Sequence, residues 1–236
     1  MKHGKLSLRG SRAIQLFSIV PVALVVTGCP KIDKDLPPLS EYEQSEGWYE
    51  DAFIRVYKSE LPTHIHPNAD IFTHPWMVLK PANSEHVVVL ELTESKGGEC
   101  DSFDAYDETQ RYQDCGHIMW QSNSGLSDID EFSEPYYGYD IDTFTLGELR
   151  GGEEVAAMVD YIFQQTPNYP CQNEYNYLTH NSNTYVKVML ENSGFYKQYE
   201  VVNEEPFSMG QSSWGAQFWK NCSIEEPDET AQTSDY

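Results

Sequence analysis

The pattern of apolar and polar positions predicts a sheet in the first half of the chain. Residues 52–58 (AFIRVYK), 72–80 (FTHPWMVLK) and 86–94 (HVVVLELTE) are rich in β-branched and aromatic side chains, which is typical of strands. Only the polar stretch PANSE separates the last two segments, so we expect them to form an antiparallel hairpin.

The register of this hairpin would bring two titratable side chains together. If Lys80 pairs with Glu85, His74 lies opposite Glu91. Cross-strand partners lie about 5 Å apart at Cβ. The Glu91 carboxylate could then accept a hydrogen bond from the imidazole of His74.

Helical periodicity appears later in the chain. Residues 151–165 (GGEEVAAMVDYIFQQ) place apolar side chains at helical spacing, with two glutamates in the first turn. Residues 183–192 predict a last helix, which Gly194 would end as the first residue beyond the cap. Residues 97–139 are rich in acidic clusters and are expected to form loops. The pattern predicts an α+β fold in which an antiparallel sheet packs against a few helices.

The first 28 residues are typical of a bacterial lipoprotein signal peptide. Four basic side chains precede a mostly apolar run, residues 13–26, that is too short to span a bilayer comfortably. The run ends in VTGC, which resembles a lipobox, so Cys29 is expected to become the lipidated N-terminus. An ordinary signal peptide and a short membrane anchor are the alternatives. Pro30 follows in place of the Asp that retains lipoproteins in the inner membrane, so we expect an outer-membrane location in the cell envelope.

Composition divides the rest of the chain into three parts. Residues 29–48 contain Pro37-Pro38 and many charges, which predicts a linker near the lipid. Residues 49–222 are enough for a single core. Residues 223–236 are acidic and short of apolar side chains, so we expect a disordered tail.

The charge balance limits the partners. The formal net charge is −23, and four of the 15 basic residues but none of the 38 acidic residues lie in the signal segment. An acidic surface repels nucleic acid and anionic lipid headgroups. We therefore expect no nucleic-acid partner and a membrane contact that runs through the N-terminal lipid. No phosphate loop or dinucleotide fingerprint is present, and no cofactor is expected.

Cysteine usage agrees with export. Apart from Cys29, four cysteines remain, and an even number in an exported chain favours two disulfides. Among the three pairings, Cys100 with Cys115 would close a short acidic loop. Cys171 with Cys222 would tie the end of the domain to the segment before the last helix. Zinc is the rival interpretation, but the chain has no Cys-x-x-Cys pair, so we expect no metal.

The turn Asn181-Ser182-Asn183-Thr184 has two interpretations. Asn, Ser and Thr side chains commonly accept hydrogen bonds from the free N–H groups of a first helical turn, and spacing alone favours this capping role. A helix N-terminus also carries partial positive charge, and a hydrolase can place a nucleophile there. In that case Ser182 would be the nucleophile.

The order of three motifs resembles an uncharacterised bacterial family that is known only as a domain of unknown function. They are the His-x-Trp-x-x-x-Lys-Pro strand at 74–81, the Glu-Leu-Arg-Gly helix start at 148–151 and the Asn-Ser-Asn-Thr-aromatic turn at 181–185. The resemblance covers roughly residues 52–195. That family in turn resembles the circularly permuted papain-like fold of lecithin–retinol acyltransferase and the PPPDE peptidases.

The resemblance implies roles for individual residues. In those enzymes a cysteine at a helix N-terminus is the nucleophile and a strand histidine is its base. Carried over, His74 is the base, Ser182 is the nucleophile, and Glu91 or His86 orients the imidazole. Ser182 stands where the enzymes have cysteine, and a serine hydroxyl is a weaker nucleophile unless a base takes its proton.

Two functions remain open at this point. One is a lipid-anchored hydrolase or acyltransferase that acts on an amide or ester with Ser182, His74 and Glu91. The other is a catalytically inactive lipoprotein that keeps the papain-like cleft and binds a peptide, a cell-wall fragment or a lipid.

Lipidation at Cys29 is directly testable. Metabolic labelling with a fatty-acid analogue should tag the wild-type protein and spare Cys29→Ala, because the VTGC sequence supplies the only thiol in lipobox context. Labelling that survives the substitution would show that the chain is not a lipoprotein of this kind.

Overall fold

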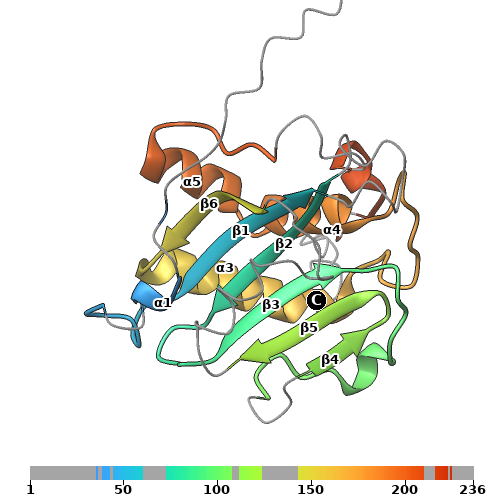
Figure 1. Ribbon diagram of the computed structural model, residues 1–236, viewed down its shortest axis with the longest axis horizontal. Coiled ribbons are helices and arrows are strands. Elements are labelled where there is room, and N and C mark those ends of the chain that lie inside the picture. The colour runs from blue at the N-terminus through green and yellow to red at the C-terminus, as the bar shows by residue number, and fades with distance from the viewer. Residues whose placement is uncertain are drawn as a thin grey trace, which may run out of the picture. The chain divides into compact units, whose positions relative to one another are not determined.

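The computed structural model describes residues 36, 39–42, 45–60, 73–107, 112–123, 143–209, 216–222 and 224. The predicted signal peptide, Cys29, most of the predicted linker and all of the predicted tail except Ile224 lie outside the described residues. The described chain has the expected α+β fold, an open antiparallel sheet with three helices packed against it (Figure 1).

The sheet has six strands in the order β4-β5-β3-β2-β1-β6, and each neighbouring pair is antiparallel. The strands are β1 (Phe53–Glu60), β2 (Thr73–Lys80), β3 (Val87–Leu92), β4 (Tyr112–Cys115), β5 (Ile118–Asn123) and β6 (Thr143–Arg150). The three strands predicted from the pattern are confirmed as β1, β2 and β3.

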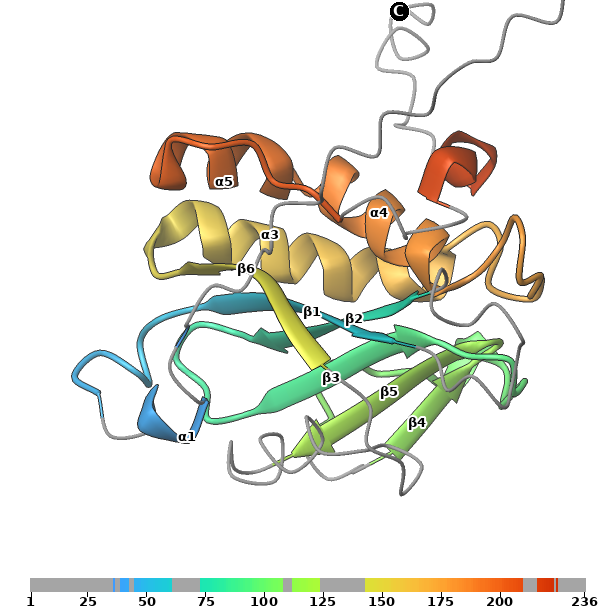
Figure 2. The same ribbon diagram turned by 45° about the horizontal axis from the view of Figure 1, so that its top comes forward.

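Three helices cover one face of this sheet, as Figure 2 shows. They are α3 (Gly152–Gln165), α4 (Ser182–Asn192) and α5 (Phe195–Asn203). The shorter elements are α1 (Leu39–Tyr42) and the 3-10 turns η2 (Cys100–Ser102), η3 (Thr166–Asn168) and η4 (Ala216–Cys222). Gly194 lies between α4 and α5 with φ 84°, in the left-handed region that ends helices, as predicted. The sequence did not predict α5.

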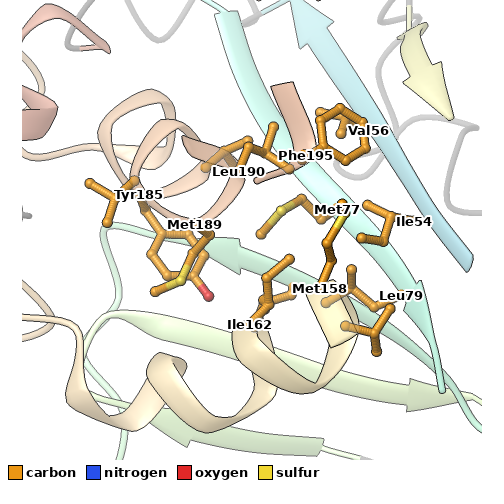
Figure 3. Close-up of a cluster of buried hydrophobic side chains, with 14 of the residues drawn as sticks. Ile54, Val56, Met77, Leu79, Met158, Ile162, Tyr185, Met189, Leu190 and Phe195 are labelled. Carbon is orange, nitrogen blue, oxygen red and sulfur yellow. The ribbon is translucent and has the colours of Figure 1, made fainter. Parts of the chain in front are cut away.

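The main core lies between the sheet and these helices. Alternate side chains of β1 and β2 point toward the apolar sides of α3 and α4 (Figure 3). Those labelled in the figure are Ile54, Val56, Met77, Leu79, Met158, Ile162, Tyr185, Met189, Leu190 and Phe195. Full burial of one such aliphatic side chain contributes about 1.5–3 kcal/mol, so this layer holds the helices on the sheet.

The opposite face of the sheet carries a second, smaller cluster. Its members are alternate side chains of β1, β2 and β3 together with one residue before β1: Trp48, Phe53, Tyr57, Trp76, Val78, Val87 and Val89. Within it, the rings of Tyr57 and Trp76 are stacked with centroids 4.2 Å apart. Arg55 forms an ion pair with Glu148 of β6, with an N···O distance of 2.6 Å.

The predicted hairpin register is wrong by two residues. The prediction paired Met77 with Val88, whereas the structure pairs Met77 with Leu90. Side chains alternate between the two faces of a strand, so a shift by two keeps each one on its face. His74 and Glu91 therefore still share a face.

Two parts of the chain were assigned wrongly from sequence. Residues 97–139, expected to be loops, contain β4 and β5, and β5 pairs along its length with β3. The Glu-Leu-Arg-Gly motif, expected to start a helix, lies in strand β6 as far as Arg150, whereas the helix predicted over residues 151–165 is confirmed as α3, which begins at Gly152. Both errors have one cause, because pairing with a buried neighbour strand overrides weak local preference.

Two disulfides are present, and they select one of the three pairings. Cys100 joins Cys115, and Cys171 joins Cys222. The first ties η2 to the end of β4, and the second ties the segment after α3 to η4. Such bridges are typical of exported proteins.

Lys80, at the end of β2, is fully buried and holds the chain before β1 against the hairpin turn. Its ammonium group donates to the carbonyl oxygens of Tyr49 at 3.2 Å, Asp51 at 2.6 Å and Pro81 at 3.0 Å. It also lies 4.8 Å from the centre of the Trp48 ring. Burial lowers the pKa of Lys80 to about 8, an effect that the Asp51 carboxylate opposes.

Replacing Lys80 with Met should change how stability depends on pH. Between the folded pKa of about 8 and the ordinary value of 10.5, the unfolded chain holds the proton and the folded chain does not. The free energy of unfolding of the wild type, minus that of Lys80→Met, should therefore rise as the pH increases through this window. Urea unfolding at its two ends measures the change, and a flat or falling difference would contradict the assignment.

Candidate functional site at the open end of β2 and β3

His74 and Glu91 form a side-chain pair on the sheet face opposite the helices. Nε2 of His74 contacts Oε2 of Glu91. The glutamate side chain is 5% exposed and the histidine side chain 22%. When the Glu91 carboxylate is ionised it can only accept hydrogen bonds, and Nε2 of His74 is then the donor. In the neutral ring, Nδ1 then presents its lone pair.

The pair lies where β2 and β3 separate. Their ladder joins Met77 to Leu79 of β2 with Val88 to Leu90 of β3 and does not continue toward Thr73. Over Thr73 to Trp76, β2 pairs with β1 and with no other strand of the described residues. The side chains of His74 and Glu91 bridge the two strands beyond the last backbone pair. We call this region the open end: Thr73, His74, Glu91 and the first residues of α4.

The N-terminus of α4 is fastened to the same region. The Asn183 side-chain amide donates to the carbonyl oxygen of Thr73 at 2.8 Å, on the residue next to His74. The β2–β3 ladder ends before Thr73, so this bond joins α4 to β2 beyond the last backbone pair of the two strands.

Asn181, not Ser182, caps this helix. Its side-chain oxygen accepts from the backbone N–H groups of Asn183 at 3.0 Å and Thr184 at 3.2 Å. Its Nδ2 donates to the carbonyl of Tyr177 at 2.7 Å, which fixes the preceding turn. The Asn-Ser-Asn-Thr turn therefore performs the capping function that its composition predicts.

Ser182 occupies the first helical position and is almost fully buried. Within the described part of the chain, its hydroxyl has no hydrogen-bond partner, and no contact joins it to His74 or Glu91. Strand alternation places His74 with Trp76 on the face away from α4. The structure brings together two of the three predicted catalytic residues, and Ser182 remains a prediction.

Two buried oxygen atoms of the open end have no hydrogen-bond partner among the described residues. They are Oε1 of Glu91 and Oδ1 of Asn183. The other oxygen of Glu91 and the amide nitrogen of Asn183 are bonded to His74 and Thr73, so neither side chain can turn to satisfy the free atom without losing a bond. An unsatisfied buried acceptor costs about 1–3 kcal/mol. A donor supplied by a ligand would remove that cost.

The other sequence candidates lie elsewhere. His86, the alternative to Glu91, lies at the opposite end of the hairpin, where its backbone N–H donates to the Ser84 hydroxyl at 2.8 Å. The four disulfide cysteines are paired as described, and Cys29 lies outside the described residues.

One cluster in the described chain has the composition of a metal site. The ligand atoms of Cys171, His180 and Cys222 lie within 4.8 Å of one another. The two sulfur atoms are bonded to each other, however, and a disulfide offers no thiolate to a metal. The cluster is therefore a structural bridge beside a histidine.

Sequence reasoning did not find Asn183. It was assigned with its neighbours to helix capping, whereas its side chain reaches across to β2. Its position two residues after the Asn181 cap was visible in the sequence, but its bond to Thr73 joins residues 110 positions apart. No local signal identifies such a partner.

The chain matches no protein-family model, no curated protein and no solved structure. None of the helices in the described segments has the length and apolar character needed to cross a bilayer. The geometry of the open end is therefore the basis for a functional assignment.

Capping by Asn181 predicts unequal effects of two neighbouring substitutions. Asn181→Ala should lower the free energy of unfolding by about 0.5–2 kcal/mol, since two N–H groups lose their acceptor. Ser182→Ala should change it by less than about 0.5 kcal/mol, because no hydrogen bond of the described chain is lost. Urea unfolding of both variants compares them, and a larger loss for Ser182→Ala would contradict the capping assignment.

Proposed function

We propose that this protein is a lipid-anchored protein of the bacterial cell envelope that binds a peptide-bearing cell-wall fragment at the open end of β2 and β3. The observation that carries the proposal is the pair of buried, unpartnered acceptors, Oε1 of Glu91 and Oδ1 of Asn183. Both belong to side chains whose remaining polar atoms are held in place.

The chemistry of these acceptors selects the class of ligand. Both require a hydrogen-bond donor, and the amide and amine groups of a peptide supply N–H donors. A lipid acyl chain supplies none and would leave both oxygens unsatisfied. The anionic Glu91 and the net charge of −23 favour a neutral or cationic ligand over an anionic one.

The export signal and the disulfides support the location. The disulfides Cys100–Cys115 and Cys171–Cys222 suit an oxidising compartment outside the cytoplasm. Lipidation at Cys29 would keep the domain at the membrane surface, where cell-wall fragments are available.

We further propose that the chain has the permuted papain-like fold. Two features support this relationship: an antiparallel sheet with a histidine on β2, and a helix whose N-terminus is bonded to the residue before that histidine. In this fold α4 takes the place of the helix that bears the nucleophile, with Ser182 at the nucleophile position.

A hydrolase or acyltransferase is the second candidate, and the contact between His74 and Glu91 favours it. A carboxylate that holds an imidazole by one nitrogen leaves the other as a base, as in a catalytic triad. For Ser182 to be the nucleophile, the His74 ring would have to reach the helix side of the sheet. The binding function needs no such movement and is the one that the geometry favours.

Two measurements on the full-length protein separate these functions. Cell-wall fragments released by a muramidase should bind the wild type, and Glu91→Gln should weaken binding about tenfold, because the anionic acceptor is lost. Glu153→Gln, on the exposed first turn of α3, is the matched control and should bind as the wild type does. Equal affinity of all three proteins would contradict the proposal.

The same preparation should be treated with a serine-reactive fluorophosphonate. The binding function predicts no labelling that depends on Ser182. Labelling of the wild type that disappears in both Ser182→Ala and His74→Ala would instead establish the hydrolase, since residues that act as one unit fail together.

A further inference from the structure

A cavity of about 380 Å³ lies at the opposite end of β2 and β3 from the site described above. It is an open pocket lined by the hairpin turn, residues 81–84 and 86, by Tyr106, and by Ala156 and Asp160 of α3. The eight residues of β2 separate the pocket from the open end by roughly 25 Å, at about 3.3 Å per residue. Its volume lies within the range of small-molecule sites.

The Tyr106 ring forms an exposed aromatic wall that is held in place from two sides. Its hydroxyl donates to Oδ1 of Asp160 at 3.0 Å. Its ring packs edge-on against Phe163, with centroids 5.4 Å apart, and remains 51% exposed. Burial and the bond to Asp160 raise the pKa of Tyr106 to about 12, so the phenol stays protonated. The Tyr106 side chain thus presents a large aromatic surface to solvent and would lose little conformational entropy when a ligand binds.

Two polar side chains that line the same pocket as this ring can still form hydrogen bonds. Within the described residues, Oδ2 of Asp160 and the side-chain amide of Asn83 have no hydrogen-bond partner. Asn83 lies in the left-handed region with φ 56°, which turns the hairpin at the cavity rim. The cavity therefore offers carboxylate and amide oxygens as acceptors and an amide N–H₂ as donor.

The lining contains no lysine or arginine, and the Asp160 carboxylate disfavours an anionic ligand. A saccharide ring fits the remaining chemistry, because its C–H face can lie on an aromatic ring while its hydroxyls both donate and accept. We propose that this cavity is a saccharide-binding site in which Tyr106 carries the sugar ring and Asp160 and Asn83 bind its hydroxyl groups. The proposal does not depend on the function assigned to the open end.

Titration with N-acetylglucosamine and its dimer, followed by NMR, tests the proposal. The full-length protein should be kept in a detergent without a sugar headgroup. We expect saturable shifts at Tyr106 and Asp160, and an affinity about tenfold weaker in Tyr106→Ala. Tyr106→Phe should retain most of the affinity, because the ring remains and only the bond to Asp160 is lost.

Tyr177→Ala is the matched control. Tyr177 is also half-exposed, at 46%, and its hydroxyl also donates to a carboxylate, Glu94, at 2.7 Å, but it does not line the cavity. It should leave saccharide affinity unchanged, as should Glu91→Gln at the open end. Absence of saturable binding at millimolar sugar would overturn the proposal. So would equal losses in Tyr106→Ala and Tyr177→Ala, or binding of the diamine putrescine at Tyr106 without binding of either neutral sugar.

Discussion

The separation of β2 from β3 beyond the Met77–Leu90 pair is the constraint on which the rest of the site depends. Backbone groups near the middle of a sheet need partners. Here the ladder stops, and side chains supply the missing contacts: Asn183 bonds to the carbonyl of Thr73, and His74 contacts Glu91 across the gap. The opening of the sheet thus leaves the His74–Glu91 pair on one face and the N-terminus of α4, bonded to Thr73, on the other.

The two ends of the hairpin are stabilised by different chemistry. At the turn, the Lys80 ammonium is bonded to three carbonyl oxygens and holds the chain before β1 against the sheet. At the open end, Glu91 and Asn183 each have one polar side-chain atom bonded and one without a partner among the described residues. Polar groups whose hydrogen bonds are all formed are typical of a structural site. Fixed side chains that keep an unused hydrogen-bond acceptor are typical of a binding site.

Much of the fold could be predicted from the sequence, because its main elements have strong local patterns. The β-branched runs of β1 to β3, the apolar spacing of α3 and the Gly194 stop are all visible in the chain. The strands β4 to β6 could not be predicted, because pairing with buried neighbours rather than local preference makes them strands.

Of the candidate site, the sequence predicted the His74–Glu91 pair but not the contacts of the first turn of α4. The contact between His74 and Glu91 was predicted correctly although the predicted register was wrong by two residues. A shift by an even number keeps each side chain on the same face of its strand. The cap required a choice among four adjacent polar residues, and composition cannot tell Asn181 from Ser182. The bond from Asn183 to Thr73 depends on how α4 packs over β2, which no local pattern encodes.

The protonation pattern of the His74 ring tests this account of the open end most directly. Long-range ¹H–¹⁵N correlation spectra of the full-length protein in mildly alkaline buffer distinguish a protonated ring nitrogen from a bare one. The account predicts a neutral ring with the proton on Nε2, facing Glu91, and a bare Nδ1, with a changed spectrum in Glu91→Gln. A proton on Nδ1, or an identical spectrum in Glu91→Gln, would contradict it.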